Sequence, residues 1–342
     1  MILRRVLIAN RGEIAVRVMR TCRRLGIETV LAVSAADADA VPARLADKTI
    51  EITSYLDVDA VVEAAAAAGA DAIHPGYGFL SENPRLARAC EAAGIVFIGP
   101  GAGVLEAAGD KLAARAHAVA AGLPVLPGGM VRTGATAPDG VPGAGGASGV
   151  GGVLEAGGAS GAGGVLGAGG AAGKSGEIAH VADAARLAGR IGYPVLGKAA
   201  GGGGGRGLRV VRDPGELAGA VAVGSAEAQA AFGDGRVYLE RYVSPARHVE
   251  VQLLGDGENV IHLGDRDCSV QRRYAKLIEE APAPRLGETL RVGMRAAAVA
   301  LGLHLKYQGL GTVEFLVDAE RAAFWFLEVN EIGRASCRER VC

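Results

Sequence analysis

The sequence predicts an α/β protein in which a doubly wound parallel sheet is followed by an α+β region and then by antiparallel sheet. Two patterns carry this prediction. Up to about residue 100, short β-rich runs alternate with segments of helical periodicity, which is typical of parallel sheets with helices on both faces. Beyond about residue 240, apolar and polar residues alternate with period two, which is typical of antiparallel strands. The chain of 342 residues is long enough for two or three domains.

The first elements form a predicted βαβ unit. A strand at residues 5–10 precedes a helix with one apolar stripe that stops at Gly26, and a second strand follows at 27–33. The stripe consists of Ile14, Val18, Cys22 and Leu25. Further along, we expect helices at 57–70 and 84–94, strands at 71–75 and 95–100, and one helix through Asp110 and Lys111.

The rest of the chain predicts two kinds of β structure. The expected elements are a helix at 177–189, strands at 193–200 and 208–211, a helix at 213–231, a strand at 237–242, and strands at 247–254, 258–263, 309–317 and 322–330. Because the last four runs alternate with period two, we expect them to pair as antiparallel sheet.

Composition argues against several classes of function. Lys and Arg number 36 against 37 Asp and Glu, so the net charge of −1 provides no basic field for nucleic acid or anionic membranes. The five cysteines form no C-x-x-C pair, which favours reduced thiols over a zinc site or a disulfide framework. Charges interrupt the apolar N-terminus, and no apolar run approaches the ~18 residues of a membrane span. We therefore expect a cytoplasmic protein with neither nucleic acid nor membrane as a partner.

A glycine-rich insertion interrupts the pattern at about 133–175. Of the 54 glycines, 15 lie in Gly143–Gly173, where a near-repeat of twelve residues carries almost no charge and no aromatic residue. Such a segment buries too little to offset the entropy lost on ordering, so we expect it to be flexible.

A second glycine cluster, Gly201 to Gly205, follows Lys198 near the end of a predicted strand. Consecutive glycines can bring backbone N–H groups against phosphate oxygens, and Lys198 would add a positive charge. The alternative is a flexible linker. Because the loop joins two strands rather than a strand and a helix, the functional interpretation is a hairpin lid over a triphosphate and not a P-loop.

Two glutamates mark a candidate metal site. Glu314 and Glu328 lie on runs that a turn at Asp318 to Arg321 would fold into a hairpin, as diagonal neighbours about 7–8 Å apart at most. Asn330 adds an oxygen donor on the same face, which suits a divalent cation such as Mg²⁺. The alternative is two solvated glutamates on an open sheet face. Their neighbours on the opposite face are expected to be Val313, Phe315, Leu327 and Val329.

Eight further motifs occur in a fixed order along the chain. They are IANRGEIAVRV, IHPGYGFLSEN, GDK, GYPV with KAAGGGGGRGLRVV, RHVEVQ, RDCSVQRR, EEAPAP and GTVEFL. Together they resemble the biotin carboxylase family of ATP-grasp enzymes over residues 1–330, except for the insertion. The resemblance implies an N-terminal domain (1–112), an ATP-grasp α+β lid (113–242), and an incomplete antiparallel-sheet domain (243–330).

The same resemblance implies a reaction and its participants. MgATP, or ATP with Mn²⁺, would phosphorylate bicarbonate to carboxyphosphate, and the released CO₂ would carboxylate biotin on a carrier protein or domain. A carboxyltransferase subunit would then use the carboxybiotin, and a homodimer is a possible assembly. The final carboxyl acceptor stays open among acetyl-CoA, propionyl-CoA, pyruvate and urea.

Site residues follow from the resemblance position by position. Lys276 would help to hold bicarbonate, and Glu314, Glu328 and Asn330 would lie on the metal side. The expected nucleotide contacts are Lys111 and Lys198 to phosphate, Gly202, Gly203, Gly204 and Gly205 in the lid, Glu240, Arg241 and Val243 at adenine, and His248 and Gln271 elsewhere on the nucleotide. For His248, the alternative is an ordinary hydrogen-bonded histidine within a strand.

The sequence departs from the family after Asn330. An arginine, a glutamine, a valine and a glutamate that grip bicarbonate and biotin are expected there, but Glu331-Ile332-Gly333-Arg334 follows instead. We interpret residues 331–342 as a non-native tail and expect the chain as written to be inactive. The alternative functions are a MgATP-binding but catalytically incomplete fragment and a non-enzymatic interaction module.

Overall fold

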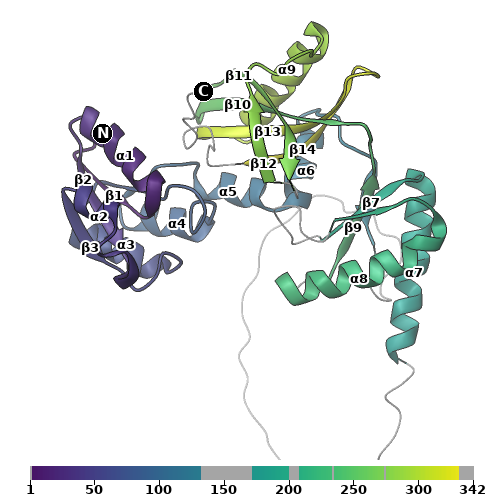
Figure 1. Cartoon of the computed structure of the whole chain (residues 1–342), viewed down its shortest axis with the longest axis horizontal. Coiled ribbons are helices and arrows are strands. Elements are labelled where there is room, and N and C mark those ends of the chain that lie inside the picture. The colour runs from purple at the N-terminus through teal and green to yellow at the C-terminus, as the bar shows by residue number, and fades with distance from the viewer. Residues whose placement is uncertain (1, 132–171, 200–207, 233–234, 273–274, 331–342) are drawn as a thin grey trace, which may run out of the picture. The chain divides into compact units, whose positions relative to one another are not determined.

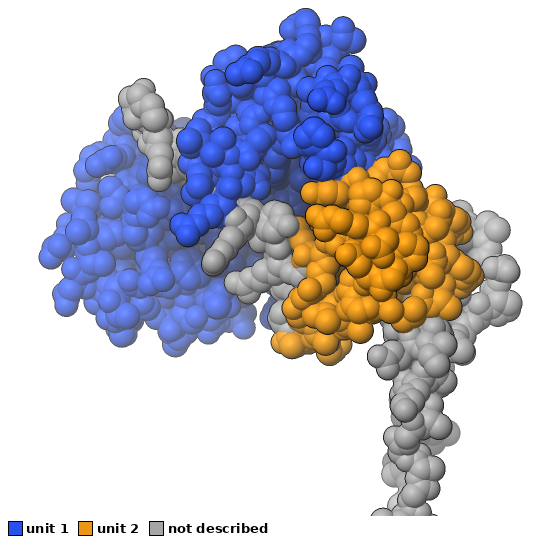
Figure 2. Space-filling view, turned by 45° about the vertical axis from the view of Figure 1, so that its right-hand side comes forward, with its two compact units in different colours: residues 1–127, 203–205, 243–342 blue, residues 128–202, 206–242 orange. Residues whose placement is uncertain are grey.

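The structure, a computed structural model, describes residues 2–131, 172–199, 208–232, 235–272 and 275–330. Two compact units divide the chain (Figure 2). The first unit contains Met1–Pro127, Gly203–Gly205 and Val243–Cys342, and the second contains Gly128–Gly202 and Arg206–Tyr242. Residues 143–171 of the glycine repeat, the loop Gly202–Gly205 and the tail 331–342 lie outside the described residues. Residues 172–175, predicted as the end of the flexible insertion, instead begin a helix at Ala172.

The first unit begins with a five-stranded parallel sheet in the order β3-β2-β1-β4-β5 (Figure 1). Its strands are β1 (Arg5–Ile8), β2 (Glu28–Val33), β3 (Lys48–Glu51), β4 (Ala72–His74) and β5 (Val96–Phe97). The helices that follow these strands include α1 (Gly12–Arg24), α2 (Val41–Leu45), α3 (Val58–Ala67) and α4 (Pro84–Ala92). The predicted doubly wound sheet is confirmed, although β3 was not predicted.

Alternate residues of the central strands enter two separate cores. Val6 and Ile8 pack with the α1 residues on one face, whereas Leu7 packs on the other face with residues of α3 and α4. Helices on both faces are what makes a sheet doubly wound. Of the predicted α1 stripe, Ile14, Val18 and Cys22 are buried as expected. Leu25 is 68% exposed because the helix ends at Arg24 and Leu25 is its C-cap.

The single helix predicted through Asp110 and Lys111 is in fact two helices. They are α5 (Ala102–Gly109) and α6 (Lys111–Ala120). Asp110 is extended, and its carboxylate accepts hydrogen bonds from the backbone N–H groups of Leu112 and Ala113 at 2.9 and 2.8 Å. An aspartate that satisfies the free N–H groups of a first turn is a strong helix start. Asp110 therefore makes Lys111 the first residue of α6.

The first unit also contains a five-stranded antiparallel sheet in the order β12-β11-β10-β13-β14. Its strands are β10 (Arg247–Asp256), β11 (Val260–Arg272), β12 (Ala275–Glu280), β13 (Gln308–Asp318) and β14 (Ala323–Asn330). One face packs against α9 (Glu288–His304) through a buried core that includes Val251, Met294 and Phe315. Strand β12 and helix α9 were not predicted, whereas the antiparallel pairing of the other four strands is confirmed.

The second unit is a four-stranded antiparallel sheet with two helices. The sheet order is β6-β9-β7-β8. Its elements are β6 (Gly128–Met130), α7 (Ala172–Ile191), β7 (Val195–Ala199), β8 (Arg209–Val211), α8 (Pro214–Phe232) and β9 (Val237–Arg241). Because β7 pairs with β8, the strands on either side of the glycine loop form the predicted hairpin. Among the described helices of both units, none combines the length and the apolar character needed to cross a membrane.

Candidate functional site

Carboxylates from three neighbouring strands form a row across the sheet of the first unit. In the strand register, Glu250 of β10 pairs with Glu314 of β13, which in turn pairs with Glu328 of β14. The predicted diagonal relation of Glu314 and Glu328 is therefore wrong, because the two residues lie directly opposite each other. Directly opposed side chains are closer than diagonal ones, so the row concentrates negative charge more than expected.

A β-bulge sets the position of this row. The register shifts between Glu314 and Phe315, so Phe315 pairs with Phe326 and Leu327 is the extra residue. Phe326 is 6% exposed and belongs to the α9 core, whereas Leu327 is only partly buried. Leu327 was therefore the wrong choice for the core face. Glu314, Glu328 and Asn330 still share the opposite face, because the bulge ends before Glu328.

Lys276 of β12 lies between two of the carboxylates. Its Nζ is 2.6 Å from Glu314 Oε1 and also contacts Glu250 Oε2. The three side chains are only 4%, 2% and 2% exposed. Arg266 of β11 binds the second oxygen of Glu250, with Nε at 2.8 Å. Buried charges are stable only when paired, and here two cations balance two carboxylates.

The electrostatic effects on Lys276 and Glu314 support each other. Burial acts to lower the pKa of Lys276, but the charges of Glu314 and Glu250 outweigh it and raise that pKa. Burial likewise acts to raise the pKa of Glu314, but the hydrogen bond from His248 and the charge of Lys276 prevail and lower it to about 2. At neutral pH the lysine is therefore an ammonium and the glutamate a carboxylate.

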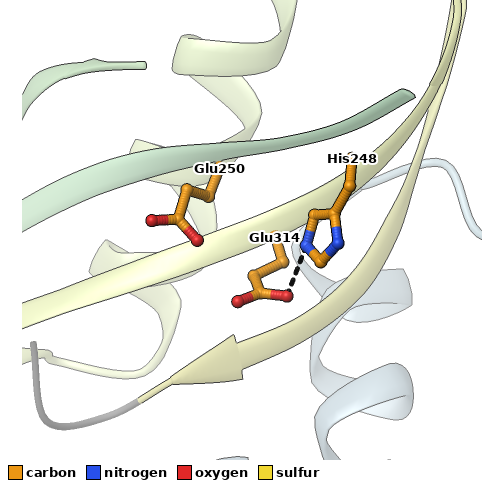
Figure 3. A group of neighbouring side chains, drawn as sticks. All are labelled: His248, Glu250 and Glu314. Carbon is orange, nitrogen blue, oxygen red and sulfur yellow. Dashed lines mark hydrogen bonds and ion pairs between the residues drawn. The ribbon is translucent and has the colours of Figure 1, made fainter. Parts of the chain in front are cut away.

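His248 and Gln271 extend the cluster along the same face. His248 Nε2 is 2.5 Å from Glu314 Oε2 (Figure 3), and Gln271 Nε2 is 2.8 Å from His248 Nδ1. The Gln271 amide also donates to the Cys268 carbonyl at 2.7 Å. Because an amide nitrogen only donates, His248 Nδ1 accepts and its Nε2–H donates to Glu314. The protein itself thus fixes the tautomer and the orientation of the imidazole.

The oxygen-rich face beside Lys276 has the chemistry of a hard-cation site. Glu314, Glu328 and Asn330 offer two carboxylates and one amide oxygen, the ligands that Mg²⁺ or Mn²⁺ prefers. The Asn330 amide nitrogen contacts Glu314 Oε1, so the asparagine already reaches the carboxylate. His248, Glu250 and Glu314 also present ligand atoms within 4.8 Å of one another (Figure 3). Lys276 would compete with a metal ion for this second group, because Lys276 contacts both Glu250 and Glu314. Glu314 belongs to both groups, so Lys276 and His248 contact a carboxylate of the first group as well.

Other predicted residues lie in the second unit or near its edge. Lys198 of β7 forms an ion pair with Glu240 of β9, and their side chains are 14% and 13% exposed. The Arg241 guanidinium donates to the Ile191 carbonyl, while Val243 follows β9 in the chain. Lys198 also lines a cavity of about 10 Å³ between the sheet and α8, which is room for one water molecule. The structure thus pairs Lys198 with Glu240, two residues predicted for different parts of the nucleotide.

Glu250 and Arg266 were missed in the sequence. Glu250 is as central to the cluster as Glu314, because both residues contact Lys276. The signal was present in the RHVEVQ motif, since period-two alternation places Glu250 on the same face as His248. Arg266 could not be found in this way, because its position depends on pairing between β10 and β11.

Comparison with known proteins agrees with the fold and with the motif order. Two family models match: "Biotin carboxylase, N-terminal domain" over residues 2–105, and "Carbamoyl-phosphate synthase L chain, ATP binding domain" over 166–337. The chain is 44% identical to a pyruvate carboxylase subunit of Methanothermobacter thermautotrophicus and 41% identical to biotin carboxylase 1 of Bacillus subtilis. These matches cover 95% and 96% of this chain, which spans 58% and 64% of the relatives.

Two solved structures extend the comparison. A biotin carboxylase–β,γ-ATP complex from Campylobacter jejuni matches with a TM-score of 0.81 and 39% identity, over 98% of this chain and 67% of that one. The biotin carboxylase domain dimer of Hydrogenobacter thermophilus 2-oxoglutarate carboxylase, in complex with MgADP, ADP and bicarbonate, matches with a TM-score of 0.79 and 38% identity. That match covers 97% of this chain and 64% of the other. Identity of this level over nearly the whole chain, with the same fold, places the protein in the biotin carboxylase family.

Proposed function

We propose that this chain is the biotin carboxylase component of a biotin-dependent carboxylase, a ligase that carboxylates carrier-bound biotin with bicarbonate and ATP through carboxyphosphate. The observation that carries the proposal is the buried Lys276 ammonium held between Glu250 and Glu314 on the polar sheet face. Bicarbonate and carboxyphosphate are anions, so a fixed cation on this face suits them.

Lys276 has the capacity to bind an anion while keeping both of its carboxylate partners. An ammonium group has three N–H donors. Among the described residues, Glu250 and Glu314 take two of them, which leaves the third for bicarbonate. Glu250 is a positioning residue in this proposal, because it holds Lys276 and is itself held by Arg266.

Mg²⁺ or Mn²⁺ would be held by Glu314, Glu328 and Asn330. The ion would supply positive charge to neutralise the ATP phosphates during phosphoryl transfer. His248 would keep Glu314 oriented through its Nε2–H donor, and Gln271 would hold the histidine in that tautomer. These contacts hold the carboxylate in place before any ligand arrives.

The nucleotide contacts are proposed from the family pattern. Lys111, Lys198 and the loop Gly202–Gly205 would contact phosphate, and Glu240, Arg241 and Val243 would contact the adenine end. The ion pair of Lys198 with Glu240 gives the lysine a partner that a phosphate would replace. The proposed partners are a biotin carboxyl carrier protein or domain, a second copy of the chain and a carboxyltransferase subunit, in the cytoplasm.

A second candidate function is MgATP binding without turnover. The sequence after Asn330 reads Glu331-Ile332-Gly333-Arg334, where the family pattern has residues that grip bicarbonate and biotin. In this case the chain would bind nucleotide through the residues above and would release no phosphate in response to biotin.

The test measures binding and turnover on the same preparation of the full chain. Calorimetry with MgATP should show binding, and Lys198→Ala should weaken it by about ten- to hundredfold through loss of a charge-assisted contact. Lys48→Ala is the matched control, because Lys48 is an exposed lysine paired with Glu28 in the parallel sheet. Phosphate release that requires both bicarbonate and biotin supports the carboxylase. Binding without such release supports the second candidate, and no MgATP binding contradicts both.

A further inference from the structure

Two histidines meet at the C-terminal ends of two helices in the first unit. His117 lies in the last turn of α6, and His304 is the last residue of α9. His117 Nδ1 and His304 Nε2 are 3.1 Å apart, and the ring centroids are 5.3 Å apart. The two imidazoles therefore turn one nitrogen each toward the same point.

We infer that His117 and His304 form a binding site for a divalent transition-metal ion that prefers imidazole, such as Zn²⁺, Ni²⁺ or Cu²⁺. An ion about 2.0–2.1 Å from both nitrogens at their present separation would be held at an angle of about 100°. That angle lies between the square-planar and tetrahedral values that these ions adopt. To form a two-histidine chelate, each ring must turn so that its nitrogen lone pair points away from the line joining the two nitrogens and toward the ion.

Buried packing anchors the two helices that carry the rings. Ala114 and Ala118 of α6 and Leu301 of α9 are 3%, 0% and 1% exposed and belong to one core cluster. The backbone beyond each histidine is also tied down, since Ala121 N–H donates to the His117 carbonyl and Tyr307 N–H donates to the Gly302 carbonyl. A chelate on two fixed helices loses less entropy on binding than one on loops.

The local field favours a cation, and solvent can deliver it. Helix C-terminal ends carry partial negative charge, and here two such ends flank the same point. His304 is exposed and His117 is half-buried, so an ion can approach from solvent while water fills its remaining positions. In the free pair, one contact nitrogen carries the shared proton. On metal binding, that proton moves through solvent to the remote nitrogen of the same ring, so neither imidazole gains or loses a proton overall.

The test is a titration of the metal-free full chain with Cu²⁺ and Zn²⁺ alone. We expect one Cu²⁺ site with two nitrogen ligands by electron paramagnetic resonance, and a rise in Tm with Zn²⁺ because only the folded chain joins the two rings. His117→Ala and His304→Ala should each weaken binding at least about tenfold and remove the Tm rise. His117→Gln keeps the side-chain volume and serves if the alanine variant folds poorly.

Two controls separate this site from others on the chain. His262→Ala removes an exposed histidine and should leave the affinity unchanged. His248→Ala removes the imidazole beside Glu250 and Glu314, a histidine-containing group among the described residues that could also hold a metal. Equal affinity in wild type and His117→Ala, or loss of binding only in His248→Ala, would overturn the inference. None of these readouts depends on ATP or biotin, so the outcome is independent of the proposed function.

Discussion

The two units each place a lysine of one strand against glutamate from another strand of the same sheet, yet the two sites differ in kind. Lys276 in the first unit is 4% exposed and serves two carboxylates, whose own second oxygens are bound by Arg266 and His248. Lys198 in the second unit is 14% exposed and, within the described part of the chain, contacts the single carboxylate of Glu240. The first arrangement is a closed network in which every charge depends on its neighbours. The second is one pair among the described residues, so in the proposed function Lys198 would exchange Glu240 for a phosphate at a smaller desolvation cost.

The largest expected effect comes from removing the shared cation. Lys276→Met keeps the approximate shape of the side chain but leaves Glu250 and Glu314 facing each other, both 2% exposed, without the lysine between them. We expect a loss of about 3–5 kcal/mol in the free energy of unfolding, measured by urea denaturation.

A double variant shows whether this loss comes from charge. In Lys276→Met with Glu250→Gln, one of the two stranded carboxylates becomes neutral, so part of the lost stability should return. The single variant Glu250→Gln completes the comparison. If the losses in unfolding free energy of the two single variants simply add up to the loss in the double variant, the network is not coupled in the way described.

The second prediction concerns acid. Because the folded-state pKa of Glu314 is about 2, below the ordinary carboxyl value of 4.5, its ionisation favours the folded state at pH values above about 4.5. That contribution, up to about 3 kcal/mol, declines as the pH falls toward 2. The Glu314→Gln variant has no carboxylate at this position, so its unfolding free energy does not contain this contribution at any pH. The difference in unfolding free energy between wild type and Glu314→Gln should therefore shrink between pH 5 and about pH 2.

The measurement is urea denaturation of both proteins at several pH values, with a chelator present so that no metal ion contributes. Asp47→Asn is a positive control. Hydrogen bonds from Thr29, outside the cluster, lower the pKa of Asp47, so the difference between wild type and this variant should also shrink in acid. A constant difference between wild type and Glu314→Gln across the pH range would contradict the low pKa of Glu314.

The contrast between the two sites also shows what the sequence could predict. Period-two alternation put Glu314, Glu328 and Asn330 on the polar faces of strands, because alternation is a local property of the chain. It could not predict the contact of Lys276 with Glu250 and Glu314, since that contact depends on how β12 and β11 pair with β10. The same limit explains Leu327, because a bulge is set by the partner strand.

The fold was predictable for a similar reason. The parallel sheet of the first unit follows from βαβ repeats in which each strand and helix is marked by its own residues. Helix α9 was missed although its buried residues Leu290, Met294, Ala298 and Leu301 recur at helical spacing. The break at Asp110 was missed because Asp110 lies between two helical runs and only its N-cap role separates them.

The smallest expected effect is at the pair in the second unit. Lys198→Met removes one cation, but Glu240 keeps a 13% exposed side chain and so retains some access to water. We expect a loss of about 1 kcal/mol or less in the unfolding free energy, well below that of Lys276→Met. Glu240→Gln should cost a similar amount, because Lys198 then keeps its own partial exposure. Urea denaturation of the four proteins under one set of conditions measures the contrast directly. A loss at Lys198 as large as that at Lys276 would mean that exposure and the number of partners do not decide the cost, and the contrast between a closed network and an exchangeable pair would fail.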